Sequence, residues 1–410
     1  MAAGTTAVAA PAVRAVVDTY ANIALAGYED SLTRARQLKS AVDTLVAKPS
    51  EETLKAAREA WKAARVPYMQ TEAFRFGNKI VDEWEGKVNS WPLDEGLIDY
   101  VDKSYGTASD SNKLYTANVI ANRKLTIAGQ PVDASSITRE LIQSLHEAEK
   151  IEANVSTGYH AIEFLLWGQD LNGTGPGAGK RPATDFSKAD CTGGNCDRRA
   201  RYLQVVTDLL VEDLTWMVEQ WKAGGEARKA LAGDDATALT AIFTGLGSLS
   251  YGEMAGERMK LGLLLNDPEE EHDCFSDNTH NSHYYDVVGI VNVYLGRYTR
   301  IDGSEVKGPS VSDLVKAKDA AIDARVRKAL DETMARMTAI KMRAETKEAY
   351  DQMIGEGNRE GNGIIDAAIA ALVAQTKEFE RAIAALELKA VKIEGSDSLD
   401  NPAKALAKKK

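Results

Sequence analysis

The sequence of 410 residues contains no run that approaches about 20 consecutive apolar residues, the length that a membrane-spanning helix needs. It also lacks a basic stretch with interleaved aromatic residues, and its formal net charge is -11. Nucleic acid is therefore not an expected partner, because binding to phosphates requires a basic surface. The first residues, Met1–Thr6, have neither the basic start nor the apolar centre of a secretory signal peptide.

Cysteine is scarce, with three residues in the chain. Cys191 and Cys196 flank a Thr-Gly-Gly-Asn loop, and they could close a small disulfide in an oxidising compartment. A pair of metal thiolates is the alternative, although no second cysteine pair accompanies them, as a zinc ribbon would require. Cys274 is left over and is expected to be a free thiol.

Proline is also scarce, with ten residues, and apolar residues recur at intervals of three and four along most of the chain. Ser50 precedes Glu51 and Glu52, the arrangement of an N-cap followed by an acidic first turn. A further long helix is expected from about Ile137 into the segment around His160. The sequence therefore predicts an all-α protein.

Glycine and proline gather between residues 171 and 197, and a segment of this kind suggests a linker between domains. We expect an N-terminal helical bundle over residues 10–170, a linker loop at 171–197, a C-terminal bundle over 198–388 and a flexible tail at 389–410. The two bundles should pack together. Loose similarity between the segments around Glu72 and Glu253 raises the hypothesis of a duplicated four-helix-bundle unit.

One apolar stretch, from Thr157 to Gly168, contains His160 and Glu163. On a helix, side chains three residues apart share a face, so this pair could bind one metal ion or share one proton. A carboxylate among apolar residues must be paired, protonated or metal-bound. The alternative is a structural hydrogen bond between the two side chains.

Other carboxylates are candidates to complete a metal site. Glu72 ends a helix of the first half, and a salt bridge with a neighbouring arginine is its alternative role. Glu253 and Glu257 are four residues apart, beside Arg258, in a glycine-rich helix. We expect one of them to face His160 while Arg258 compensates charge, with an intrahelical network as the alternative. The glycines indicate that another backbone approaches this helix closely.

A polar loop from Asp273 to Tyr285 supplies further candidates. Asp277 and His283 lie in it, and His280 and His283 are spaced like ligands of one metal. Histidines at a loop or helix start are also commonly solvated, so both interpretations stay open.

Several blocks of the chain resemble the imelysin family. The main block is Gly158-x-His160-x-x-Glu163 followed by an aromatic-Leu-Leu-Trp-Gly run. The others are Trp91-Pro92-Leu93-Asp94, the block from Gly252 to Met259, the block from Asp273 to His280, and Asn292-Val293-Tyr294-Leu295-Gly296. Trp91, Asp94, Gly158, Arg258, Asp277 and His283 are accordingly expected to support the site. The resemblance is greatest to the iron-regulated branch of the family.

The resemblance implies an exported protein in the periplasm or attached to the outer membrane, with a lipid tether in the precursor as one route. It also implies a role in iron uptake. We expect His160, Glu163 and facing carboxylates to hold iron or an iron-bearing ligand at the interface of the bundles. Zinc suits the same ligands, and haem is not excluded. Components of an iron transport system are the expected protein partners.

Two other functions are consistent with the sequence. A metallopeptidase of the imelysin type would use His160 and Glu163 as metal ligands, but the chain lacks the His-Glu-x-x-His motif of zinc peptidases. No residue is therefore assigned a catalytic role. The third hypothesis is a non-catalytic interaction module in which the His-Glu pair is a structural clasp.

Overall fold

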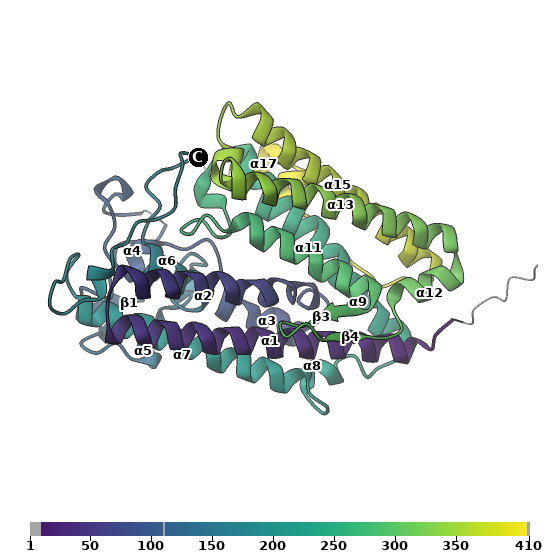
Figure 1. Cartoon of the computed structure of the whole chain (residues 1–410), viewed down its shortest axis with the longest axis horizontal. Helices are drawn as coiled ribbons and strands as arrows, with labels where there is room; N and C mark the ends of the chain where they lie inside the picture. Colours follow the sequence, from purple (N-terminus) through teal and green to yellow (C-terminus); the bar gives the residue numbers. More distant parts are fainter. Residues whose placement is uncertain (1–9, 110, 408–410) are drawn as a thin grey trace, which may run out of the picture.

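The computed structural model describes residues 10–109 and 111–407, and its regular structure is almost entirely helical. The prediction of an all-α fold is confirmed. Figure 1 shows two groups of long helices, with α1, α2 and α7 along one side and α11, α13 and α15 along the other. The long helices are α1 (Val13–Ala47), α2 (Glu51–Met69), α3 (Lys79–Asn89), α6 (Gly158–Trp167), α7 (Cys196–Trp221), α9 (Asp235–Ser248), η5 (Leu249–Lys260), α11 (Thr279–Leu295), α13 (Ala320–Thr346) and α15 (Arg359–Ala385).

Shorter helices connect these elements. They are η1 (Glu72–Phe74), α4 (Glu95–Ile98), η2 (Lys103–Tyr105), α5 (Arg139–Leu145), η3 (Ala148–Lys150), η4 (Ala183–Phe186), α8 (Glu226–Lys229), α10 (Leu261–Leu265), η6 (Pro268–Glu270), α12 (Val311–Lys318), α14 (Tyr350–Ile354), α16 (Asp397–Asp400) and α17 (Pro402–Ala407). Two antiparallel hairpins complete the fold, β1 (Lys124–Ile127) with β2 (Gln130–Asp133) and β3 (Arg297–Thr299) with β4 (Glu305–Lys307).

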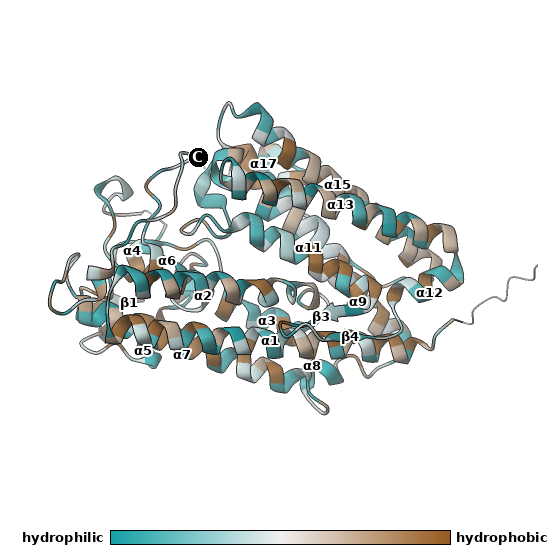
Figure 2. Ribbon diagram, viewed as in Figure 1, coloured by the Kyte–Doolittle hydropathy of each residue, from teal (hydrophilic) through white to brown (hydrophobic). Residues whose placement is uncertain are grey.

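The two groups of helices meet where α11 packs against α2 and η1, and where α9 packs against α1. Apolar residues lie mainly on the sides of helices that face their neighbours (Figure 2). No helix among the described residues is long and apolar enough to cross a membrane. The hydrophobic core is thus shared between long helices, and α6 is buried along its whole length.

Ser50 caps α2 as predicted: its side chain accepts a hydrogen bond from the Thr53 amide, and the Ser50 amide donates in turn to the Thr53 hydroxyl. The expected continuous helix from Ile137 to His160 is wrong. α5 ends at Leu145, and Glu147, Glu149 and Lys150 then have positive φ values, which an α-helix does not accommodate.

The helix with many glycines is a π-helix, η5. Hydrogen bonding from residue i to i+5 widens the helix, and such segments are frequent at functional sites. A β-carbon at Gly252 would lie 2.7 Å from the carbonyl oxygen of Glu394. The expected close approach of another backbone therefore occurs, and the approaching segment comes from the C-terminal end of the chain.

That C-terminal segment lies within the tail expected at 389–410, whose flexibility stays a prediction. Its described part packs along η5, where the Ser396 hydroxyl donates to Glu257 Oε1 at 2.6 Å and the Ser398 hydroxyl donates to the Gly256 carbonyl at 2.9 Å. The sequence of this segment did not predict the packing, because the segment has few apolar residues and the contacts are made by a glycine carbonyl and by serine hydroxyls. Residues 408–410 lie outside the described residues, as does Met1–Thr6.

The division of the chain at residues 171–197 stays a prediction, as does the duplication. α7 follows this segment in the sequence and packs against α1 and α6 of the first group of helices.

Candidate metal centre

Gly158 begins α6 and sets the position of the His160 helix. Its φ is +80°, and a β-carbon there would lie 2.4 Å from the carbonyl oxygen of Val88. Glycine is the residue that tolerates both the left-handed backbone and the close contact. The glycine of the Gly158-x-His160-x-x-Glu163 block thus lets α6 start directly against the end of α3.

His160 and Glu163 make the contact that their spacing predicts. His160 Nδ1 lies 3.0 Å from Glu163 Oε2, and both side chains are buried. The other oxygen of Glu163, Oε1, accepts hydrogen bonds from the amide of Ser276 at 3.0 Å and from its hydroxyl at 2.7 Å. Glu163 therefore fixes the His160 ring and the loop before α11 at the same time.

The second ring nitrogen of His160, Nε2, is buried and has no hydrogen-bond partner within residues 10–109 and 111–407. A buried polar atom without a partner is costly and calls for an explanation such as an ion. The ring lies against that of His272, with centroids 4.8 Å apart. Trp91 packs edge-on against His272 at 5.5 Å, and its indole N–H donates to the Glu271 carbonyl.

Asp273 and Arg65 complete the cluster. Arg65, from α2, donates to Asp273 Oδ1 at 2.8 Å and lies 3.2 Å from His272 Nδ1. Asp273 Oδ2 accepts from Asn278 and Ser282. The loop between η6 and α11 is thereby attached to both α2 and α6.

Burial controls the charge of these groups. It lowers the pKa of His160 to about 3, with a further contribution from the guanidinium of Arg65, so the ring is neutral at physiological pH. Burial likewise lowers the pKa of His272. Burial and the charge of Asp273 both raise the pKa of Glu163. Burial opposes ionisation of Asp273, but the charge of Arg65, the neighbouring His160 and the hydrogen bonds from Ser282 and Asn278 together lower the pKa of this carboxyl. The cluster thus offers neutral imidazoles beside one carboxylate.

His160, His272 and Asp273 each offer one ligand atom, and these three atoms lie within 4.8 Å of one another. Two imidazole nitrogens and one carboxylate oxygen suit iron or zinc. Both oxygens of Glu163 already have partners, His160 Nδ1 and Ser276. A metal-ligating histidine usually has a carboxylate bound to its second ring nitrogen. The donor set therefore fits a transition metal, with Glu163 as an orienting group.

A cavity of about 560 Å³ lies beside this cluster, and Trp91 and His272 form part of its wall. The acidic residues of its lining are Asp82, Glu83, Glu85, Glu147, Glu152, Glu253, Glu257 and Glu270, against two arginines, Arg75 and Arg258. A cleft lined mainly by one sign of charge raises the local concentration of the opposite ion. The cavity can thus attract cations to the wall that contains His272.

Arg258, which also lines this cavity, pairs with two of the predicted carboxylates. It donates to Glu72 at 2.8 Å, to Glu253 at 2.7 Å and to Asp286 at 3.0 Å. The five-residue spacing from Glu253 to Arg258 matches the repeat of the π-helix, so this pair shares a face. The structure thus places Glu72 and Glu253 in an ion-pair network around Arg258, while His160 contacts Glu163 and His272.

The remaining predicted residues lie apart from His160. Glu257 lines the acidic cavity and accepts from Ser396. Asp94 accepts a hydrogen bond from Asn112. His283 is buried, with its ring 5.1 Å from that of Tyr350 and both nitrogens unpartnered in the described part of the chain.

Asp277 lies near Asp170 and Asp351 instead of His160. Cys191 and Cys196 form a disulfide, and Cys274 is a free, half-buried thiol. Sequence reasoning missed His272 and Arg65, and it named Asp273 only as the start of a loop, without a role as a ligand. His272 directly precedes the Asp273 block, and this adjacency was the available signal.

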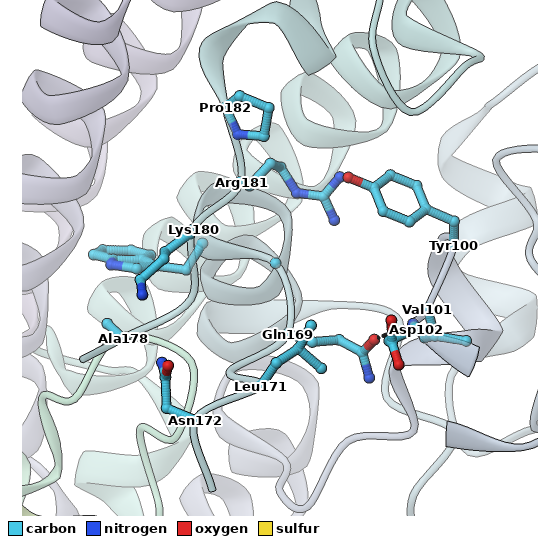
Figure 3. Close-up of a pocket in the computed structure, with 12 residues that line it drawn as sticks. Tyr100, Val101, Asp102, Gln169, Leu171, Asn172, Ala178, Lys180, Arg181 and Pro182 are labelled. Carbon is cyan, nitrogen blue, oxygen red and sulfur yellow. Dashed lines mark hydrogen bonds between the residues drawn. The ribbon is translucent and has the colours of Figure 1, made fainter. Parts of the chain in front are cut away.

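A second cavity, of about 400 Å³, opens where α6 ends. Figure 3 shows Arg181 directed at Tyr100, with its guanidinium carbon 5.0 Å from the ring centroid. Asp99 and Asp185 each lie 2.8 Å from Arg181 and neutralise its charge. This cavity lacks the excess of carboxylates that marks the cavity beside His272.

The comparisons with known proteins agree with the motif. A model of the family described as Imelysin matches residues 24–379. Iron-regulated protein A of Synechococcus elongatus is 24% identical over 294 residues, which are 68% of this chain and 63% of that protein. The chain thus spans less than two thirds of the length of this relative.

Two solved structures share the fold. One, described as an iron-regulated protein A precursor from Parabacteroides distasonis, has a TM-score of 0.64 at 19% identity and covers 92% of this chain and 96% of its own. The other, an imelysin-like protein from Psychrobacter arcticum, has a TM-score of 0.59 at 14% identity, with 93% and 99% covered.

Proposed function

The chain belongs to the imelysin family, and on that premise we propose that it binds iron reversibly in an uptake-related role. The ligands are His160, through Nε2, together with His272 and Asp273, and Glu163 orients the His160 ring. The observation that carries the proposal is the buried, unpartnered Nε2 beside two other donors. The name of the relative from Synechococcus elongatus, an iron-regulated protein, favours iron over zinc.

Reversibility follows from the neighbours of Asp273. Its Oδ1 is bound to Arg65 and its Oδ2 to Asn278 and Ser282, so an ion must share this carboxylate with existing partners. The guanidinium of Arg65 also repels a cation. These costs weaken the site relative to a dedicated metal centre, and a weaker site suits a protein that delivers its ion to a transport component.

The acidic cavity is the route by which the ion reaches His272. Haem fits this route less well than a bare cation, because its propionates would meet carboxylates. An exported location, in the periplasm or at the outer membrane, is part of the proposal. The Cys191–Cys196 disulfide supports it, since disulfides persist in oxidising compartments.

Burial argues against the metallopeptidase hypothesis. The side chains of His160 and Glu163 are 2% and 0% exposed, so a peptide bond cannot reach them without a rearrangement of the loop before α11. Wild type should hydrolyse peptides no faster than His160→Ala. Strong hydrolysis by wild type that His160→Ala abolishes would replace the binding function with the peptidase function.

The test of iron binding is anaerobic titration calorimetry with ferrous iron on wild type, His160→Ala and His272→Ala. Both variants should bind at least about tenfold more weakly, because each removes one of three ligands. His146→Ala is the matched control, since His146 is also largely buried but lies outside the cluster. Circular dichroism checks folding. Wild-type affinity in folded His272→Ala would overturn the ligand set and favour the structural clasp.

A further inference from the structure

A second group of carboxylates meets around Asp277, in the loop that also contains Asp273 and Ser276. Asp170 follows α6, Asp277 precedes α11, and Asp351 lies in the first turn of α14. One oxygen from each lies within 4.8 Å of the others. Three segments that are far apart in the sequence therefore present acidic side chains to one point.

These carboxylates have free coordination capacity. Asp351 is 2% exposed, and neither of its oxygens has a hydrogen-bond partner of ordinary geometry in the described chain. Asp277 Oδ1 is buried and equally unpartnered there. Asp170 accepts two hydrogen bonds from Asn172, at 2.9 and 2.6 Å, both through Oδ1. A buried carboxylate without partners is costly, and a bound cation removes that cost.

Electrostatics point the same way. Burial raises the pKa of Asp351 to about 7, with the charge of Asp277 adding to it. Burial also raises the pKa of Asp277 to about 6, with Asp170 adding and Lys62 opposing. The positive charge near the three aspartates is thus insufficient to balance theirs.

We propose that Asp170, Asp277 and Asp351 form a second cation site, separate from His160, that binds a hard divalent ion of the calcium class. The donors are carboxylate oxygens without nitrogen or sulfur, which suits calcium, magnesium or manganese and not a thiophilic metal. A set of ligands from two loops and one short helix fits the variable geometry of calcium better than the strict octahedron of magnesium.

The bound ion would tie together the segment after α6, the loop before α11 and α14. The first two of these segments already touch, since the Gly179 amide donates to the Phe275 carbonyl at 2.9 Å. Ser276, beside Asp277, holds Glu163. Occupancy of the aspartate site would therefore stabilise the loop that closes the His160 cluster.

The test is calorimetric titration of the chelator-treated chain with calcium chloride at pH 7.5, beside thermal unfolding with and without calcium. Wild type should bind one ion and gain thermal stability. Asp351→Asn should bind at least about tenfold more weakly and gain none. Asp213→Asn is the matched control, because burial raises the pKa of this lone carboxyl to about 6 as well; it should behave like wild type.

Without calcium, Asp351→Asn should unfold at or above the wild-type temperature, because it relieves repulsion among buried carboxylates. This keeps the variant foldable. His160→Ala should leave calcium binding unchanged, which separates this site from the iron site. The proposal would be overturned if wild type bound no calcium, or if Asp351→Asn and Asp277→Asn both bound calcium as tightly as wild type. The three residues would then be a cluster of aspartates that share protons.

Discussion

The imidazole rings of His160 and His272 lie against each other, with centroids 4.8 Å apart and planes at 71°. One ring belongs to the buried helix α6 and the other to the loop between η6 and α11. Their contact connects α6, which contains the Gly158-x-His160-x-x-Glu163 block, with the acidic cavity that His272 lines.

Replacing Glu163 with Gln should weaken metal binding about 10- to 100-fold while the fold persists, because the amide no longer holds the His160 ring as a carboxylate does. Titration calorimetry measures the effect. The exposed Glu59→Gln on α2 is the control and should leave affinity unchanged. A complete loss of binding in folded Glu163→Gln would instead indicate direct coordination by Glu163.

Gly158→Ala should destabilise the protein by about 2–4 kcal/mol, since alanine disfavours φ of +80° and its β-carbon would collide with the Val88 carbonyl. Gly303→Ala is the matched control: φ there is +86°, and no atom lies within 4 Å of the added carbon. It should cost about 1 kcal/mol. Urea denaturation of both variants compares them, and equal losses would show that the contact with α3 contributes nothing.

Arg258→Met should cost about 3–5 kcal/mol of unfolding free energy, because it leaves the buried Glu72 without its counter-charge and removes the guanidinium that, against burial, lowers the pKa of Glu253. Arg336→Met removes an exposed pair with Glu332 and should change stability by less than about 1 kcal/mol. Denaturant titration at pH 7 distinguishes the two. A small effect of Arg258→Met would mean that these carboxyls do not depend on Arg258 for their counter-charge.

Acid should destabilise the fold through His283. Burial, and then the charge of Arg258, lower the pKa of His283 to about 3, whereas the pKa in an unfolded chain is about 6.5. Asp273 and Glu253 oppose this shift, and His280 adds to it. Between these pH values the unfolded chain binds a proton that the native state does not. Stability is therefore complete above pH 6.5 and falls as the pH drops towards 3.

His283→Phe removes this proton uptake and retains an aromatic ring opposite Tyr350. The difference in unfolding free energy between pH 7 and pH 4 should be smaller in the variant than in wild type by roughly 1–3 kcal/mol. Urea titrations at both pH values measure it. An unchanged difference would show that His283 takes up no proton on unfolding.

The sequence was sufficient for those parts of the site that depend on local geometry. The all-α class followed from periodicity, and the His160–Glu163 contact followed from a spacing of three residues on a helix. His272 could not be predicted in the same way, because its approach to His160 depends on how the loop before α11 packs against α6.

The π-helix shows a second limit. An α-helical repeat places Glu253 and Glu257 on one face, whereas the wider helix pairs Glu253 with Arg258. Glycines at Gly252 and Gly256 signalled a close backbone neighbour but could not identify it as the C-terminal segment. Long-range packing, and not local propensity, determined both outcomes.

The central claim is that His160, His272 and Asp273 bind iron together. The most direct measurement is an anomalous difference map, recorded at the iron absorption edge from crystals of the wild-type chain soaked in ferrous iron under anaerobic conditions. The account predicts a peak at bonding distance from His160 Nε2 that also contacts His272 and Asp273. It would be contradicted by a map without a peak at His160, or by one whose iron lies among the cavity carboxylates alone.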